Sequence, residues 1–459
     1  MWSTPTETSG LRFKDENAYA RGAARRPRIA PSVKDQHRSD AVVPASLCEP
    51  TESRALNFWV QNWTDKPSEI PDIGREYLAY IPGYCKSSRA DSTLRLALSA
   101  LSLMVFGRVH GAGTAIVQAN KYYARVIRNT RDEVELRNLT EELPILTTFA
   151  KTATFKPSNL PTDSIVEIAG NRAGARFWKD VCHYLGTAGL LKSGSDQEQQ
   201  CSQNLDLYRA VRRPIVRAAI LRGMNVQGWL KDAAAFGEQG PALMLDALMV
   251  RVAGLRAKAL RIQHVAGLIS STLILSLEDI LDAGRHLDLE LSLWPDKITG
   301  DYEFSSSSFD PPDRDKLPWC TSIAHNYRPY SHAAAWNRYR AARMIIHSLL
   351  VGTITQLAGH TTLGSAILGQ LQMSLVAIPS LSTEICCSIP YFFNYNVPSS
   401  ENIIPKVVTH LAWPLTVAIG IKTIPEVEKF WLRRTLRSVA VALGDSVLEC
   451  VSQGDDFEF

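Results

Sequence analysis

Apolar residues recur at helical spacing along most of this chain from about residue 54 onward, and no long run alternates apolar with polar side chains. Leu94, Ala97 and Leu101 belong to one such stripe, with the spacing of a helix that buries one face. A half-buried strand would instead need a period of two over several residues. The sequence therefore predicts an all-α fold, a large bundle or array of stacked helix pairs, over residues 51–459.

The same periodicity, together with Gly, Pro and Ser residues that interrupt it, places the individual helices. The polar stretch 295–318 is predicted to be a loop, Pro214 to kink a helix or to open a second helical segment, and Pro390 to interrupt a helix. The predicted helices are a run that starts at Leu94, then Thr114–Thr130, Phe177–Leu191, Leu205–Gly223, Ala242 to about Ser276, Leu277–Leu293, a helix around Trp336, Ser365 to about Val376, and Glu426–Val447.

Residues 1–50 differ in composition from the rest, because Ser, Thr, Pro, Arg and Asp are common there and large apolar residues are few. Such a segment buries too little surface to offset its ordering entropy, so a disordered, polar and basic tail is predicted. The tail contains a short basic cluster that could act as a nuclear-import signal or contact phosphate, or could simply be solvated. Its members are Arg21, Arg25, Arg26 and Arg28.

Charge and composition restrict the kinds of partner to expect. Lys and Arg number 50 against 46 Asp and Glu, a net charge of +4, which does not argue for nucleic-acid binding by the whole surface. No secretory leader is evident, and the best membrane-span candidate, residues 407–421, is shorter than the ~20 apolar residues that a span needs. We therefore expect a soluble intracellular protein without a membrane segment.

The motifs of common catalytic and metal sites are missing from the sequence. There is no Cys-x-x-Cys, His-Glu-x-x-His, Gly-x-Ser-x-Gly or Walker-type glycine loop, and the adjacent Cys386 and Cys387 would chelate one metal ion poorly. We expect neither a catalytic residue, nor a metal site, nor a cofactor.

The helix around Trp336 combines aromatic and guanidinium side chains. One interpretation is a surface that binds an effector or a partner protein. The other, which the sequence favours, is that the arginines cover apolar surface and pair with acids inside the helical array. The candidate surface residues are Trp336, Arg338, Arg340, Arg343 and Trp413.

Several short motifs follow one another in a recognisable order along the chain. They are Leu94–Leu101, Ala119 with Tyr122 and Tyr123, Trp178 with His183 and Gly186, Leu207–Arg212 with Trp229, Asp279–Pro295, Trp336-Asn337 with Tyr339-Arg340 and Arg343, Trp413-Pro414-Leu415, and Trp431 with Leu436. Their order resembles the regulatory region of fungal transcription factors of the binuclear zinc-cluster type. The zinc cluster itself is absent, because only Cys48 precedes the helical region, and the Pro-broken stretch 135–175 replaces an expected Leu-rich helix.

This resemblance implies a transcriptional regulator of the nucleus that acts through other regulator or transcription-machinery proteins or through effectors, in some relatives for a metabolic gene cluster. It implies a homodimer or heterodimer and only weak or indirect contact with DNA. A missed exon upstream of Met1 that encodes the zinc cluster would appear as a cysteine-rich reading frame in the genomic DNA.

Two other functions remain open from the sequence. One is a small-molecule-sensing helical module, suggested by the aromatic residues around Trp336, Trp413 and 391–393. The other is an all-α enzyme of a biosynthetic pathway, for which an aspartate-rich metal motif on a helix would be the sign. The nearest acidic pairs, Glu278-Asp279 and Asp455-Asp456, suit a helix start and a solvated tail better.

Overall fold

A computed structural model of the chain describes residues 49–63, 89, 92–135, 202–264, 270–298, 302–308, 321–328, 330–393, 404–454 and 459. The chain divides into two units, Met1–Glu49 and Pro50–Phe459, and the second contains nearly all the described residues. The expectations for the N-terminal tail, including Arg21, Arg25, Arg26 and Arg28, lie outside the described residues, as does the predicted helix 177–191.

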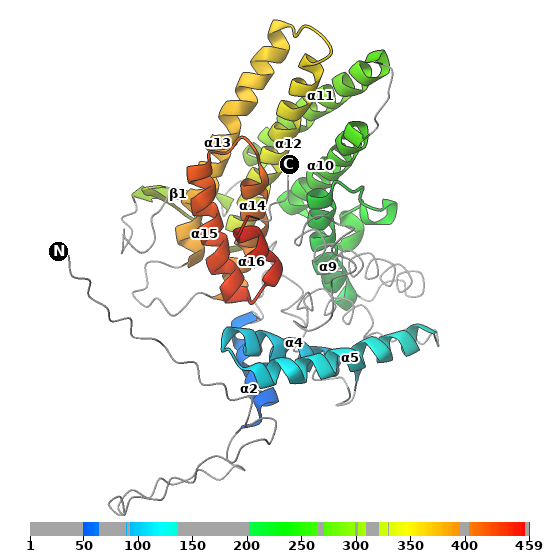
Figure 1. The fold of residues 1–459 in the computed structure, drawn as a ribbon, viewed down its shortest axis with the longest axis vertical. Helices are drawn as coiled ribbons and strands as arrows, with labels where there is room; N and C mark the ends of the chain where they lie inside the picture. The colour runs from blue at the N-terminus through cyan, green and yellow to red at the C-terminus, as the bar shows by residue number, and fades with distance from the viewer. Residues whose placement is uncertain are drawn as a thin grey trace, which may run out of the picture. The chain divides into compact units, whose positions relative to one another are not determined.

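The all-α prediction is confirmed, since the described part of the chain holds eleven α-helices and one two-stranded sheet (Figure 1). The strands β1 (Ser305–Ser308) and β2 (Ile323–Asn326) pair antiparallel, with Ser305 opposite Asn326. The helices are α2 (Thr51–Trp63), α4 (Thr93–Val109), α5 (Gly113–Glu135), α9 (Ser202–Arg222), α10 (Gly240–His264), α11 (Ser270–Ser292), α12 (Tyr330–Ala358), α13 (Ser365–Phe393), α14 (Pro405–Gly420), α15 (Glu426–Leu443) and α16 (Ser446–Ser452).

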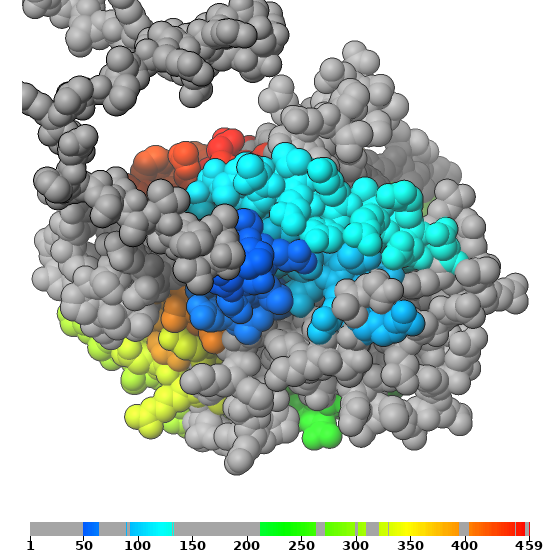
Figure 2. Space-filling model, turned by 90° about the horizontal axis from the view of Figure 1, so that it is seen from below, coloured from blue at the N-terminus to red at the C-terminus, as the bar shows by residue number. Residues whose placement is uncertain are grey.

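Helices α2, α4 and α5 pack together around a small core of their own (Figure 2, blue and cyan). Ser92 caps α4, because its hydroxyl accepts a hydrogen bond from the Arg95 amide at 3.3 Å. Gly111, with φ of 65°, makes the tight turn after which α5 runs back along α4. Glu52 of α2 accepts hydrogen bonds from Ser99 of α4 at 2.6 Å and from the Tyr122 hydroxyl of α5 at 2.8 Å, so one carboxylate joins all three helices.

Helix α12 lies at the centre of the larger core. Its residues Ala341, Met344 and Ile345 are buried, and the helix packs against α10, α11, α13 and α14. In Figure 1, α12 (yellow) runs beside α13, and α14 and α15 lie next to one another. Leu411 of α14 and Leu436 of α15 extend the same apolar cluster toward the C-terminal helices.

Several predicted boundaries were wrong. The long helix expected from Ala242 to about Ser276 is two helices, α10 and α11, and five residues that include Gly267, a weak helix former, separate them in the sequence. The last helix, expected to reach Val447, ends at Leu443, where Gly444 takes φ of 64° and Asp445 caps α16. Residues 305–308, expected in a loop, form β1.

Helix α13 runs through Pro390, which was expected to interrupt a helix, and also through Pro379. Pro379 and Pro390 each remove a backbone donor from the helix. Packing outweighs this loss, because Ile385, Ile389 and Phe392 are buried in the main core. Pro214 likewise lies inside α9.

In the part of the chain that the structure describes, two helices are long and apolar enough, by length and composition, to cross a membrane: α12 and α13. In the most apolar window of each, 67% and 56% of the residues are buried inside the protein. Core helices of water-soluble proteins meet the same criterion, so this is weak evidence, and the absence of a membrane span stays a prediction.

Candidate functional site

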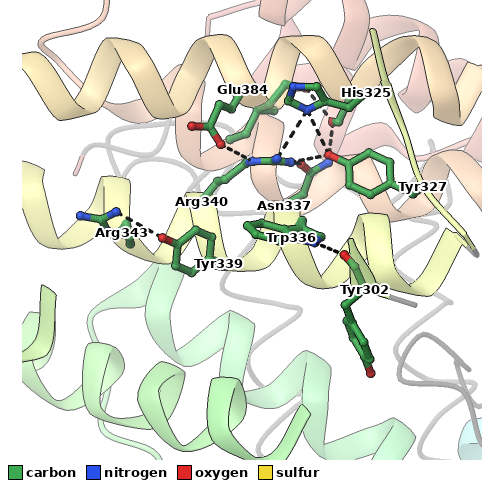
Figure 3. A network of polar contacts seen from close by, with 11 residues as sticks. Tyr302, His325, Tyr327, Trp336, Asn337, Tyr339, Arg340, Arg343 and Glu384 are labelled. Atoms are coloured by element: carbon green, nitrogen blue, oxygen red, sulfur yellow. Dashed lines mark hydrogen bonds and ion pairs between the residues drawn. The ribbon is translucent and has the colours of Figure 1, made fainter. Parts of the chain in front are cut away.

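The guanidinium of Arg340 is the centre of a buried polar network (Figure 3). Its side chain is 0% exposed, and α12 places it between α13 and the β-hairpin. It donates to the carboxylate of Glu384 at 2.9 Å, to the hydroxyl of Tyr327 at 2.7 Å and to the side-chain oxygen of Asn337 at 3.0 Å. The Nδ1 atom of His325 lies 3.5 Å from the same guanidinium. The cation therefore satisfies its donors within the protein.

Aromatic rings enclose the same guanidinium. Its central carbon lies 5.2 Å from the ring centre of Phe304, 5.4 Å from that of Trp336 and 5.9 Å from that of Tyr327. The indole of Trp336 donates in turn to the backbone oxygen of Tyr302 at 2.8 Å. These contacts fasten the segments that carry β1 and β2 to α12.

Two neighbours of Arg340, His325 and Tyr327, are neutral at pH 7. Burial, with the nearby Arg340 charge, lowers the pKa of His325 to about 4. Burial raises the pKa of the Tyr327 hydroxyl, although Arg340 opposes this shift. Glu384 therefore supplies the negative charge that faces Arg340 in this network.

A second, partly buried network lies one helical turn further along α12. Arg343 donates to both carboxylate oxygens of Asp288 on α11, at 2.8 and 3.2 Å. His347 Nε2 lies 3.3 Å from the same carboxylate, and His347 Nδ1 lies 3.1 Å from the Ser374 hydroxyl of α13. Burial alone would raise the pKa of Asp288, but hydrogen bonds from His347 and Arg343 lower it to about 2. This network joins α11, α12 and α13.

The five residues proposed from the sequence as an effector or partner surface do not form one surface. Arg340 is enclosed, and Trp413 is 8% exposed within the main core. Trp336 and Arg343 are half-buried in the networks above, and Arg338 donates to the Ala334 carbonyl of its own helix at 3.3 Å. Arg340 and Arg343 instead pair with acids inside the helical array, which is the arrangement that the favoured interpretation gave.

The aromatic residues that suggested a small-molecule cavity pack on one another. Tyr391 lies with its ring centre 4.9 Å from that of Tyr330 and 5.4 Å from that of Tyr327. Phe392 contacts Tyr330 and His410. These ring contacts join α12, α13 and α14.

A hollow that the sequence analysis did not foresee lies where α4 and α15 meet. Its volume is about 940 Å³, and among the described residues four arginines but no Asp or Glu line it. Figure 2 shows the cyan surface of α4 and α5 beside the red surface of α15 and α16. The lining residues are Phe58, Asn62, Arg108, Val109, His110, Pro405, Phe430, Arg433, Arg434, Arg437, Ser438, Val441, Ala442 and Ser452.

Two contacts shape the arginine side of this hollow. Arg108 donates to the Gly444 carbonyl at 2.9 Å, which joins the end of α4 to the end of α15. Arg433 lies 3.4 Å from Glu426, a carboxylate that also pairs with Lys429. The spacing of Arg433, Arg434 and Arg437 along one helix was the available sequence signal, but nothing in it indicates that α4 lies opposite.

Among the described residues, no group of three or more His, Cys, Asp or Glu side chains could hold a metal ion. Comparisons with protein-family models, curated proteins and solved structures found no match to this chain. The resemblance to fungal transcription factors therefore stays a prediction from the order of the motifs.

Proposed function

We propose that this chain is the regulatory module of a transcription regulator and acts in the nucleus through contacts with other proteins. The order of motifs from Leu94 to Leu436 supports this proposal. The most distinctive of them, around Trp336 and Arg340, builds the joint between α12, α13 and the hairpin. Because these residues hold helices together inside the protein, the outer faces of the helices remain for contacts with partner proteins.

The exposed half of α13 is the observation that carries the proposal. Between Ser365 and Thr383 this helix has no charged side chain. Leu368, Met373 and Val376 are 49%, 60% and 61% exposed. A surface helix that needs no partner usually carries charged residues on its outer face, whereas contiguous exposed apolar surface marks an interaction site.

The occupant that fits this face is a second copy of the chain. A two-fold axis makes an interface self-complementary, and a charged residue close to the axis would meet its own copy. The face has none, and small residues such as Ala366 and Gly369 lie beside the large Leu368 and Met373, which allows close helix packing. We therefore propose a homodimer through α13, with DNA contacted only indirectly.

The double variant Met373→Glu/Val376→Glu tests this surface. It places acidic side chains of both copies opposite one another, so we expect the wild-type chain to have a dimeric mass by light scattering and the variant a monomeric one. Val117→Glu, which changes an exposed valine of α5, is the matched control and should remain dimeric. A wild-type monomer at all concentrations, or an unchanged mass of the double variant, would contradict the dimer.

A reporter measurement tests the regulatory role separately. The chain is fused to a DNA-binding domain of known specificity, and transcription from the matching promoter is measured. We expect the wild-type and Val117→Glu fusions to change the reporter level and Met373→Glu/Val376→Glu to reduce that change. A wild-type fusion with no effect on transcription, when its dimeric mass is normal, would count against the regulatory role and leave the dimer standing.

A further inference from the structure

The hollow between α4 and α15 has the size of a ligand pocket. Its volume of about 940 Å³ falls in the upper part of the range of small-molecule sites, about 300–1,000 Å³. Its walls come from α2, α4, α14, α15 and α16, so a molecule inside would contact five helices.

The charge of the lining selects the sign of the ligand. Arg108 approaches from α4, and Arg433, Arg434 and Arg437 approach from α15. Glu426, near Arg433, is not part of the lining. Guanidinium groups gathered in a concave surface concentrate positive potential and bind carboxylate or phosphate through paired hydrogen bonds. The hollow therefore favours an anion.

The rest of the lining selects a ligand with an apolar part. Phe58, Val109, Phe430 and Val441 line the same hollow as the arginines. Val109, Phe430 and Val441 are exposed in this structure, and covering them would remove apolar surface from water at about 25 cal/mol per Å². A simple inorganic anion would leave this surface uncovered.

We infer that this hollow binds a small organic anion, in which a carboxylate or phosphate group is joined to an apolar chain or ring. The anionic group meets Arg434 and Arg437, and the apolar part lies on Phe430 and Val441. Such a ligand spans α4 and α15 and so strengthens the link between the α2–α4–α5 cluster and the C-terminal helices. This inference does not depend on the transcriptional role proposed above.

Titration calorimetry with simple probes tests the site. Octanoate and octyl phosphate carry both required parts, octanol lacks the charge, and inorganic phosphate lacks the apolar chain. We expect the wild-type chain to bind at least one amphipathic anion at least tenfold more tightly than octanol or inorganic phosphate. The comparison of octanoate with octyl phosphate then identifies the preferred head group.

Variants locate the binding. Arg434→Gln/Arg437→Gln should weaken binding of the amphipathic anion at least tenfold, and Phe430→Ala should weaken it without changing the binding of inorganic phosphate. Arg125→Gln/Arg128→Gln, an exposed pair with the same spacing on α5, is the matched control and should bind as the wild type does. The single variant Arg437→Gln changes an exposed residue and is included because its fold is the least disturbed.

The inference is overturned if neither amphipathic anion binds the folded wild-type chain, or if the α15 and α5 pairs have the same effect. An acidic peptide that binds more tightly than both probes and loses its affinity in Arg434→Gln/Arg437→Gln would also overturn it, because the hollow would then be a protein-docking site. Circular dichroism of each variant without ligand separates lost binding from lost folding.

Discussion

The packing of α12 against its neighbours depends on the geometry of one buried charged side chain, Arg340. Its planar guanidinium serves Glu384, Tyr327 and Asn337 at once, which the single ammonium of a lysine cannot do in the same directions. Removing donors from a buried network leaves acceptors without partners, a larger effect than the net worth of the bonds.

Arg340→Lys is therefore expected to lower the free energy of unfolding by at least about 2 kcal/mol, because two acceptors each lose a partner at a cost of about 1–3 kcal/mol. Urea unfolding followed by circular dichroism measures the change. Arg338→Lys, at a half-buried position that bonds its own helix, should change it by less than about 0.5 kcal/mol. Equal effects of the two substitutions would show that the network does not hold α12 in place.

The His325 imidazole gives the folding free energy a defined dependence on pH. Its pKa is about 4 in the folded chain against 6.5 as the ordinary value, so between these values the unfolded chain binds a proton that the folded chain does not. Stability should therefore fall as pH is lowered from about 6.5 to 4, and Asp288, with its pKa lowered to about 2, should extend the fall below pH 3.8. His325→Asn should flatten the first part of this profile.

Urea unfolding at pH 7, 5.5 and 4.5 provides the measurement for His325→Asn. His360→Asn, at an exposed position in the loop after α12, is the control and should retain the slope of the wild type. If the free energy of unfolding of His325→Asn depends on pH as that of the wild type does, other groups cause the acid sensitivity.

Arginine pairing inside the array could be predicted from composition and spacing, but the partners could not. Glu384 and Asp288 lie 44 and 55 residues from the arginines that they contact. Only the packing of α11 and α13 on α12 brings them together, and a local pattern holds no information about that packing. The same limit applies to Arg108 and the α15 arginines, which lie more than three hundred residues apart in the sequence.

At the scale of elements, the sequence located the helices where local signals dominate. The helix predicted to start at Leu94 is α4, and the helix predicted at 114–130 is α5, which extends beyond both predicted ends. The sequence misplaced boundaries where tertiary packing dominates, as in α13, which continues through Pro379 and Pro390. The serine strand β1 carries no alternating pattern, because all four of its residues are exposed and pairing with β2 alone defines it.

At the scale of the whole molecule, burial differs strongly between individual helices. In α2 only Ala55 and Trp59 are buried, whereas α12 is buried along most of its length. A helix of 13 residues is marginal without tertiary contacts, so α2 depends on its partners. The bonds from Ser99 and Tyr122 to Glu52 are the polar part of that dependence, and the hydrogen bond to Glu52 raises the pKa of Tyr122.

Glu52→Ala is therefore expected to accelerate hydrogen exchange of backbone amides in α2, α4 and α5 while exchange in α12 stays unchanged. The physical reason is that local opening of the smaller cluster costs less free energy than unfolding of the main core. The substitution lowers only the free energy of this local opening. Asp132→Ala, which removes an exposed acid from α5, is the control and should leave the hydrogen-exchange rates of both clusters unchanged. If exchange in α12 instead rises together with that in α2, the two clusters unfold as one cooperative unit.

A ligand in the arginine-lined hollow should oppose the effect of Glu52→Ala, because it contacts α4 and α15 together.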